Sequence, residues 1–348
     1  MPAGPLQTKP RALNYALDFC RGDIIGVWDA EDAPAPDQLH RVVQRFQESG
    51  PDLACLLGQL DFYNPRVNWL ARCFTIEYAS WFRVLLPGME HFGFAILLVC
   101  TTLFFRCDSL EGLGAWDAHN VTEDADLGIR LARQGYRTEM IETTTQEEAN
   151  CQALPWIKQR SRWLKGYAMT WAVHMRNPLA LWRELGPWRF FGMQVVFLGT
   201  LSQIVLAPLL WSFWLILLGL SHPLGEAMPT AIFWGAVGIF VASELVNIAI
   251  GTLGIVRSGR HQMICWVPFM HFYFPLGALA SYKALWEVVV APFYWDKTMH
   301  GLHDEAPEEQ PDPVEIPEQA ALPLRDVSAP PPEPAKPETV AVDQAATG

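Results

Sequence analysis

The sequence lacks paired cysteines and any excess of basic residues, and these absences exclude several classes of protein. Its seven cysteines are scattered through 348 residues without a Cys-X-X-Cys pair. This argues against a disulfide scaffold or a zinc site and fits a reducing compartment or a membrane. The net charge is -12, with 25 Lys and Arg against 37 Asp and Glu. The composition therefore gives no global polyanion-binding character, and we expect no nucleic acid partner.

Charge is also missing from long stretches in the second half of the chain. Residues 190–220 contain no charged side chain, residues 230–256 contain one, and residues 264–281 form a shorter apolar segment with two prolines. About 20 consecutive apolar residues are enough to cross a bilayer. We predict a membrane domain over residues 176–302, with two or three transmembrane helices at about 190–220, 230–256 and 264–281.

The distribution of arginines predicts the orientation of these helices. Arg183 and Arg189 precede the first apolar segment, and Arg257 and Arg260 follow the second, whereas residues 221–229 contain no Lys or Arg. Because basic residues flank membrane helices on the cytoplasmic side, the arginine-flanked ends and the N-terminal domain are expected in the cytoplasm. The sequence thus predicts a multi-pass protein of the cell inner (plasma) membrane.

One pair of polar residues interrupts the second apolar segment. Glu244 and Asn247 lie inside it. Polar residues at such positions face either a functional, water-filled cavity or a neighbouring helix. The sequence leaves both explanations open.

The first 175 residues have the pattern of an α/β domain. Helical spacing is found over residues 11–19, 36–46, 69–86 and 154–173. Apolar runs at residues 23–28, 53–60 and 136–141 predict strands, the first of them a buried strand of a parallel sheet. Residues 142–150 are polar and predict a loop. Residues 303–348 are rich in Pro, Glu and Ala, and we expect a disordered tail there.

Three short polar motifs could carry chemistry, although each has an ordinary structural explanation. Asp29-Ala30-Glu31, followed by Asp32, fits a solvated turn. Thr122-Glu123-Asp124 fits a capped helix start, because negative charge is stabilising in a first turn. The segment from Gln159 to Trp163, with Arg162, fits a helix anchored at a membrane interface.

Taken together, the order and spacing of these motifs resemble the processive, cellulose-synthase-like glycosyltransferases of family 2. The resemblance covers roughly residues 8–301. It implies a GT-A-type (Rossmann-like) α/β domain followed by transmembrane helices. It also implies an enzyme that transfers a sugar from a nucleotide diphosphate sugar, expected to be a UDP-sugar, to a β-linked polysaccharide or another glycan acceptor.

The resemblance also implies a role for each motif residue. Asp29, Glu31 and Asp32 would hold Mg²⁺ or Mn²⁺ at the diphosphate. Asp124, in the catalytic motif with Thr122 and Glu123, would deprotonate the acceptor hydroxyl, with a pKa lowered by the nearby cation. The substrate would be bound by Lys9 and Asn14 in the nucleotide pocket, Arg162 at the diphosphate, and Gln159 and Trp163 at the acceptor sugar.

The sequence departs from the family pattern in two places. The family's domain opens with a strand, helix and strand that hold the nucleotide, and these elements are absent before Thr8, which would leave an unpaired sheet edge. The family's Gly-rich acceptor loop is replaced by Val99 to Phe104. Residues 293–298 resemble the loop that closes over the nucleotide. The alternatives are a truncated, inactive membrane remnant or assembly subunit, and a transporter with a cytoplasmic regulatory domain.

Overall fold

The computed structural model describes residues 8–99 and 101–292. The predictions for residues 293–298 and for the tail lie outside these ranges. The elements of the sheet domain are α1 (Lys9–Leu17), β1 (Ile24–Val27), β2 (Ala33–Pro34), α2 (Gln38–Glu48), β3 (Leu53–Phe62), α3 (Trp69–Ser80), the π-helix η1 (Trp81–Leu85), α4 (Leu86–His91), β4 (Leu103–Arg106), α5 (Cys107–Gly112), α6 (Glu123–Arg133), β5 (Arg137–Glu147) and α7 (Ala153–His174).

The strands form one mixed sheet in the order β1-β4-β3-β5-β2. Strands β3 and β5 are parallel, whereas β1 and β3 both pair antiparallel with β4, and β2 pairs antiparallel with β5. The expected parallel pairing of the first strand is therefore wrong. β1 lies at the edge of the sheet and alternates between buried and more exposed side chains, as antiparallel strands often do.

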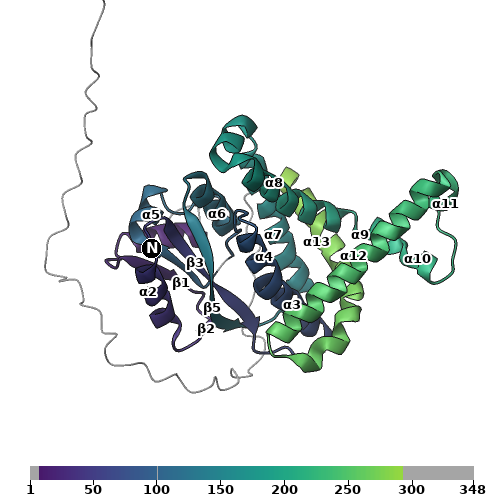
Figure 1. The fold of residues 1–348 in the computed structure, drawn as a ribbon, viewed down its shortest axis with the longest axis horizontal. Helices are drawn as coiled ribbons and strands as arrows, with labels where there is room; N and C mark the ends of the chain where they lie inside the picture. The colour runs from purple at the N-terminus through teal and green to yellow at the C-terminus, as the bar shows by residue number, and fades with distance from the viewer. Residues whose placement is uncertain (1–7, 100, 293–348) are drawn as a thin grey trace, which may run out of the picture. The chain divides into compact units, whose positions relative to one another are not determined.

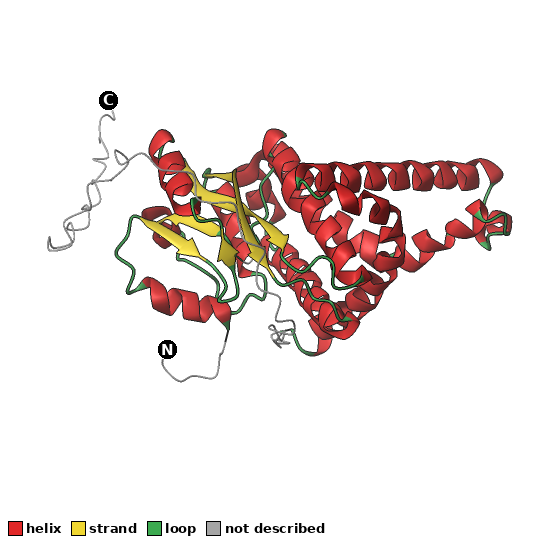
Figure 2. Ribbon diagram, turned by 90° about the horizontal axis from the view of Figure 1, so that it is seen from below, coloured by secondary structure: helices red, strands yellow, loops and turns green. Residues whose placement is uncertain are grey.

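Helices cover both faces of the sheet (Figures 1 and 2). On one face, Val42 and Phe46 of α2 pack against Leu56 and Phe104. On the other face, a second core joins the sheet to η1, α4, α5 and α6 through residues that include Leu57, Leu103, Phe105, Phe82, Leu110, Leu127 and Leu131. Because adjacent residues of β3 and β4 point to opposite faces, both strands are buried on both sides.

Strand β5 is longer than the sequence predicts, because it continues to Glu147 through the residues expected to form a loop. Thr143 and Thr145 point inward and are buried. Gln38 of α2 satisfies their hydroxyl groups, with its Nε2 2.9 Å from Thr143 Oγ1 and 3.1 Å from Thr145 Oγ1. The buried hydroxyl groups of Thr143 and Thr145 are therefore satisfied by hydrogen bonds within the protein.

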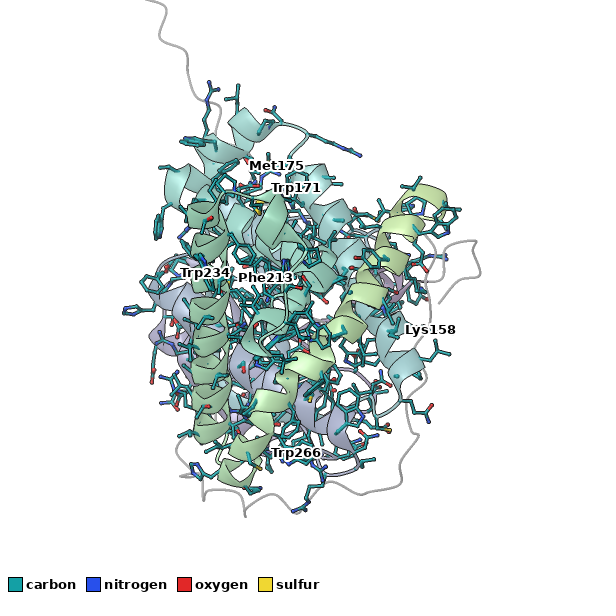
Figure 3. All side chains as sticks on the ribbon, turned by 90° about the vertical axis from the view of Figure 1, so that its right-hand side faces the viewer. Lys158, Trp171, Met175, Phe213, Trp234 and Trp266 are labelled. Carbon is teal, nitrogen blue, oxygen red and sulfur yellow. The ribbon has the colours of Figure 1, made fainter. Side chains whose placement is uncertain are left out.

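The rest of the described chain is helical. It comprises α8 (Pro178–Val205), α9 (Ala207–Ser212), α10 (Trp214–Leu217), α11 (Leu224–Ala227), α12 (Thr230–Arg257), the 3₁₀ helix η2 (His261–Phe269) and α13 (Met270–Val290). Gly186, with a φ of 73°, breaks α8 near its start. Figure 3 shows the side chains of this part, where Phe213 packs 5.7 Å from the ring of Phe240 and Trp234 is exposed.

Two helical stretches are long and apolar enough to cross a bilayer, Thr230–Arg257 and His261–Val290. A third candidate exists if Pro178–Val205 and Ala207–Leu217 are counted as one span, but they are bent by 59°. The bend falls at the start of α9, where Pro208 follows a short break. The predicted first span is thus a broken helix in this structure.

Helix α7 is packed between the sheet domain and these helices. It lies along α13 (Figure 1), and Lys165 Nζ is 3.0 Å from Glu287 Oε2 of α13. The side chains of Trp156 and Lys165 are almost fully buried. The side of α7 that carries Trp156 and Lys165 therefore packs against protein. The sequence alone is also compatible with a helix at a membrane interface.

Candidate active site

The Thr122-Glu123-Asp124 motif forms the start of α6. Asp124 is 2 % exposed, and neither of its carboxylate oxygens accepts a hydrogen bond from the residues that the structure describes. Burial raises the pKa of Asp124 to about 6. Burial, together with the adjacent Asp124 charge, raises the pKa of Glu123 to about 8. The expected lowering of the Asp124 pKa is therefore not found, because desolvation outweighs the attraction of nearby cations such as Lys9.

Asp126, the third acidic residue in the first turn of α6, has a carboxylate that is paired with neighbouring side chains. Asp126 Oδ2 is 2.7 Å from Arg130 Nε, and its Oδ1 is 3.0 Å from His174 Nε2. Burial opposes the ionisation of Asp126, but the hydrogen bond with His174 and the charge of Arg130 outweigh it and lower the pKa. Asp126 is thus a structural ion-pair partner, whereas Asp124 is left without one.

In the acidic turn after β1, the hydroxyl group of Thr101 links the backbone of Asp29 to the side chain of Asp32. Asp29 N donates to Asp32 Oδ2 at 2.8 Å and to Thr101 Oγ1 at 3.1 Å. Thr101 Oγ1 in turn donates to Asp32 Oδ2. Lys9 Nζ lies 2.5 Å from Asp29 Oδ1. Thr101 belongs to the stretch in which the sequence departs from the family pattern, and here it holds the acidic turn in place.

The next residue of that stretch has an unusual backbone. Thr102 has a φ of 55°, a left-handed conformation that is disfavoured for β-branched residues. Its Oγ1 is 2.8 Å from Thr145 Oγ1, and a Cβ atom on Gly58 would come within 2.7 Å of the same oxygen. The packing on β3 and β5 therefore sets the conformation of the loop that carries Thr101.

The acidic residues fit a divalent cation that arrives together with a phosphate ligand. No group of three His, Cys, Asp or Glu side chains within residues 8–99 and 101–292 is arranged to hold a metal ion alone. However, Mg²⁺ in proteins is commonly bound by one or two carboxylates together with the phosphates of a substrate. Asp29 and Glu31 line the cavity described below, and one buried oxygen of Asp32, Oδ1, has no hydrogen-bond partner among the described residues.

Helix α7 brings the third motif against the start of α6. Its close approach depends on Gly166, because a Cβ atom there would lie 2.2 Å from Thr122 Cγ2. Asn120 links the two elements, since its Nδ2 donates to Thr170 Oγ1 at 3.0 Å and its Oδ1 accepts from Thr122 N at 3.0 Å. The hydroxyl of Thr122 is 3.2 Å from that of Thr170. Thr122 thus fixes the position of the motif.

The structure brings most of the predicted site residues to one cavity of about 550 Å³. Its walls include one set of predicted residues: Asp29, Glu31, Thr122, Asp124, Gln159, Arg162 and Trp163. Lys9 and Asp32 adjoin this wall through their contacts with Asp29. The charge of Arg162 acts on Glu123, whose pKa it lowers against the larger effect of burial.

Two predicted residues are placed differently. Glu123 does not line the cavity, although it is buried beside Asp124. Asn14 holds the chain ahead of the α6 motif, with its Nδ2 2.7 Å from Trp116 O and its Oδ1 3.0 Å from Trp116 N. Because both ends of its amide are used for this contact, Asn14 acts on the site through the Trp116 loop.

The sequence analysis missed Glu147, which lines the same cavity at the end of β5. Burial, together with the charges of Asp32, Asp29 and Glu31, raises the pKa of Glu147 well above its usual range. The residue was missed because residues 142–150 were assigned to a loop. The alternation of Thr143, Thr145 and Glu147 was the signal that could have extended the strand and placed this carboxylate at its end.

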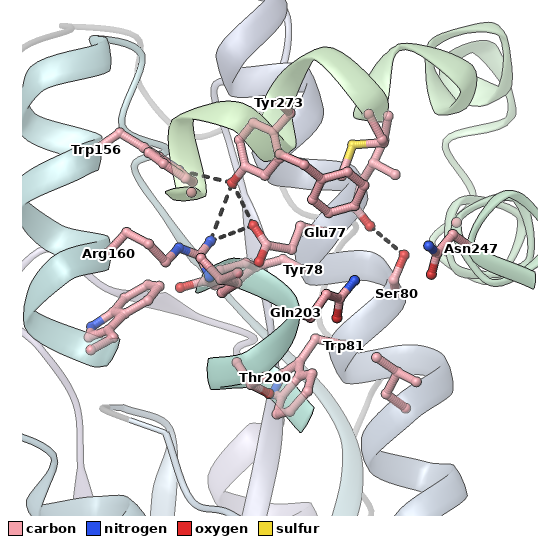
Figure 4. Close-up of a pocket in the computed structure, with 18 of the residues that line it drawn as sticks. Glu77, Tyr78, Ser80, Trp81, Trp156, Arg160, Thr200, Gln203, Asn247 and Tyr273 are labelled. Atoms are coloured by element: carbon pink, nitrogen blue, oxygen red, sulfur yellow. Dashed lines mark hydrogen bonds and ion pairs between the residues drawn. The ribbon is translucent and has the colours of Figure 1, made fainter. Parts of the chain in front are cut away.

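Beyond these residues the cavity continues among the helices (Figure 4). Arg160 Nη2 lies 2.5 Å from Glu77 Oε2, and Tyr273 Oη donates to the same oxygen at 2.5 Å. Trp156 Nε1 donates to Tyr273 Oη at 2.9 Å. This network ties α7 to α3 and α13, and it was not predicted from the sequence.

Comparison with known proteins defines the class of this protein. The sequence model described as glycosyl transferase family group 2 matches residues 24–224. The chain therefore belongs to this family, as the motifs predicted, and the matched residues include most of its α/β domain.

Several curated relatives share this sequence similarity. The chain is 28% identical over 222 residues to a β-monoglucosyldiacylglycerol synthase of Synechocystis sp., covering 61% of this chain and 44% of the relative. It is 27% identical over 280 residues to glucomannan 4-β-mannosyltransferase 7 of Arabidopsis thaliana, covering 76% and 46%. It is 25% identical to cellulose synthase 2 of Novacetimonas hansenii, covering 57% and 12%. The chain thus spans less than half the length of these relatives.

A solved structure is also similar in part. The mannosyltransferase PcManGT from Pyrobaculum calidifontis, in complex with GDP-Man and Mn²⁺, aligns with a TM-score of 0.43 and 17% identity. The alignment covers 81% of this chain and 67% of that structure.

Proposed function

We propose that this protein is a membrane glycosyltransferase that transfers a sugar from a nucleotide diphosphate sugar to a hydroxyl group of a glycan or lipid acceptor. The observation that carries the proposal is the meeting of Asp29, Asp124, Arg162 and Trp163 on one cavity in a chain of this family. They come from the turn after β1, from α6 and from α7, so their meeting depends on the fold.

Asp124 has the properties required of a general base. A carboxyl group with a pKa of about 6 is mostly ionised at neutral pH, and it is more basic than an exposed aspartate. In the proposed reaction it accepts the proton of the acceptor hydroxyl. The hydroxyl oxygen then forms a bond to the anomeric carbon of the donor as the bond to the nucleoside diphosphate breaks.

The leaving diphosphate requires positive charge. Arg162 would bind it through its planar guanidinium group, which matches phosphate geometry. Asp29 and Glu31, with Asp32 adjoining, would hold Mg²⁺ or Mn²⁺, which supplies further neutralisation of the diphosphate when bound. Trp163 offers a flat face on which an acceptor sugar can stack.

The proposed substrates are taken from the names of the relatives. The relatives are named as a β-monoglucosyldiacylglycerol synthase, a glucomannan 4-β-mannosyltransferase and a cellulose synthase. We propose a UDP-sugar donor and an acceptor that is either a lipid alcohol or a glycan. The proposed location is the cell inner membrane, with the sheet domain in the cytoplasm.

Contacts of two arginines support this orientation. Arg257 Nη1 donates to Arg83 O at 2.6 Å, and Arg260 Nη2 donates to Phe62 O at 2.8 Å and lies 3.4 Å from Asp61 Oδ1. The basic end of α12 is therefore attached to the sheet domain. Basic flanks favour the cytoplasmic side, so the same side is proposed for the catalytic residues.

The test is sugar transfer by the full chain in lipid nanodiscs, with UDP-glucose or GDP-mannose, MnCl₂, and either diacylglycerol or a β-linked oligosaccharide as acceptor. Asp124→Asn is expected to lower turnover at least about a thousandfold, because it removes the base. Donor binding should change by less than about threefold, since the nearby charges remain. The matched control is Asp117→Asn, at an exposed carboxylate, and it should behave as wild type. Turnover by Asp124→Asn close to that of wild type would refute the assignment of the base.

A further inference from the structure

Helix α7 ends on a buried histidine that the proposed reaction does not use. His174 is the last residue of α7, and it is 4 % exposed. Its ring faces α6, where its Nε2 lies 3.0 Å from Asp126 Oδ1 and its Nδ1 lies 3.0 Å from Arg133 Nη1. A buried polar group is costly unless it has partners. Both ring nitrogens of His174 have theirs on α6.

These two partners select one form of the imidazole ring. The guanidinium group of Arg133 has only N–H donors, so Nδ1 of His174 must act as the acceptor. The neutral ring then carries its proton on Nε2, on the side of the Asp126 carboxylate. A proton on Nδ1, whether in the other neutral tautomer or in the imidazolium ion, would set one N–H against another. The neutral ring with its proton on Nε2 therefore suits both contacts.

The charged groups around the ring already form pairs. On α6, Arg130 Nε is 2.7 Å from Asp126 Oδ2. From α8, Glu184 Oε2 lies 2.5 Å from Arg133 Nε. Each of these arginines thus has its own carboxylate, and the ring does not need a charge to balance its surroundings. His174 acts here as a neutral bridge between two ion pairs.

The bridge lies one helical turn beyond the contact that fixes the catalytic motif. Thr170 of α7 has its hydroxyl 3.2 Å from that of Thr122 at the start of α6. His174 follows Thr170 by four residues, and Asp126 follows Thr122 by four residues, so each pair lies on one face of its helix. The two helices are therefore joined at two successive turns, and Asp124 belongs to the segment of α6 between these contacts.

We propose that His174 is a positioning residue for Asp124, which it holds at a fixed distance from the α7 residues Arg162 and Trp163 by joining α6 to α7 as a neutral imidazole. The inference rests on the proposed function. His174 does not line the cavity, so it acts on the reaction through α6. A displacement of about 1 Å between a base and the reacting groups can cost about 100-fold in rate. Turnover should therefore depend on this contact more than donor binding does.

The kinetic test uses the full chain in nanodiscs. His174→Leu removes both contacts but keeps an apolar side chain, whereas His174→Gln retains a donor and an acceptor. His174→Leu should lower kcat at least about tenfold and change the donor KM by less than about threefold, because the groups proposed to bind the diphosphate remain. His174→Gln should recover most of the lost kcat. His40→Leu, at an exposed histidine of α2, is the matched control and should keep both constants.

A spectroscopic test reports the ring directly, without turnover. Proton–nitrogen correlation spectra of protein with isotope-labelled histidine distinguish the two neutral tautomers from the imidazolium ion. The His174 signal is identified by its absence from His174→Gln. At neutral pH it should have the pattern of a ring protonated on Nε2 alone. A signal of the Nδ1-protonated tautomer or of the imidazolium ion would overturn the proposal, and this measurement does not require His174→Leu to fold.

The kinetic outcomes separate this inference from the proposed function. Wild-type kcat in folded His174→Leu would overturn the positioning role, and the proposed function would stand. Equal losses of kcat and of thermal stability in the Leu and Gln variants would also overturn it, because the ring would then matter only for packing. Absence of transfer by the wild type with every donor and acceptor would instead overturn the proposed function.

Discussion

The two ends of the cavity differ in whether their charged side chains are paired. At the end of the cavity lined by Asp29, Asp124 and Arg162, here called the outer end, Asp124 is buried with both oxygens unpartnered among the described residues, and burial raises its pKa. At the inner end, among α8, α12 and α13, Arg160 and Glu77 form an ion pair across helices, and Glu244 Oε2 lies 2.8 Å from His271 Nδ1. Unpaired buried charge is costly, so it persists where a ligand or a reaction uses it. Paired charge in the same cavity holds helices together.

The largest effect is expected for Arg162. Arg160 and Arg162 both belong to α7 and line the same cavity, but only Arg162 is proposed to bind the diphosphate. Arg162→Gln should lower kcat/KM about 100-fold, because a charge-assisted contact to the leaving diphosphate is lost. Arg162→Lys should recover only part of this activity, since it lacks the planar fork. Steady-state kinetics measures both, with exposed Arg176→Gln as control. A kcat/KM of Arg162→Gln equal to that of wild type would show that Arg162 does not bind the leaving diphosphate.

The next effect concerns the contact that builds the outer end. Gly166→Ala places a methyl group against Thr122 and should displace α7, lowering both the unfolding free energy, by about 1–3 kcal/mol, and the activity, by about tenfold. Gly199→Ala is the matched control, because nothing lies within 4 Å of its added Cβ. Thermal unfolding in detergent and the transfer assay report the two effects. Equal behaviour of both variants would show that the close contact is not needed.

At the inner end, removing one partner of a pair should affect stability more than catalysis. Glu77→Gln leaves Arg160 without its carboxylate and should lower the unfolding free energy by about 2 kcal/mol, reduced from the value for a fully buried pair because Glu77 is partly exposed. Activity per folded molecule should stay within about threefold. The exposed variant Glu48→Gln should change neither quantity. A loss of turnover in folded Glu77→Gln would place this network in the chemistry instead.

The smallest effect is a dependence of stability on pH. Because the pKa of Asp124 is raised to about 6 in the folded protein, the folded state binds this proton more tightly than the unfolded state. The resulting stabilisation is present at about pH 4 and is lost as the pH rises through about 6. In metal-free protein at about pH 8, Asp124→Asn should therefore be more stable than wild type by about 1–2 kcal/mol. Denaturation at several pH values measures this. A variant that is less stable than wild type at high pH would contradict it.

The sequence predicted the elements that depend on local pattern and the residues that belong to ordered motifs. Helices α2, α6, α7 and α12 and strand β3 follow from apolar periodicity, and Asp29, Asp124 and Arg162 were found through their spacing. Strand direction was not predictable for β1, because a short apolar run is compatible with either pairing. Glu147 was missed because residues 142–150 were assigned to a loop. Thr101 was missed because its role depends on contacts with Asp29 and Asp32, which only the folded sheet brings together.

The inner end of the cavity was the least predictable region. Glu244 and Asn247 are three residues apart on one helix and both line the cavity, yet only Glu244 lies close to His271 of α13. Their different environments depend on which side of α12 meets α13. No periodicity within α12 contains that information.

The most direct test of the account is a calorimetric titration of UDP-glucose, and separately GDP-mannose, into the purified full chain with and without Mn²⁺. We predict micromolar binding of one donor that is weakened at least about tenfold by chelation of the metal and by Asp29→Asn, since both remove the site of the diphosphate-bound cation. Absence of binding for both donors, with or without the metal, would contradict the claim that this cavity is the donor site of a glycosyltransferase.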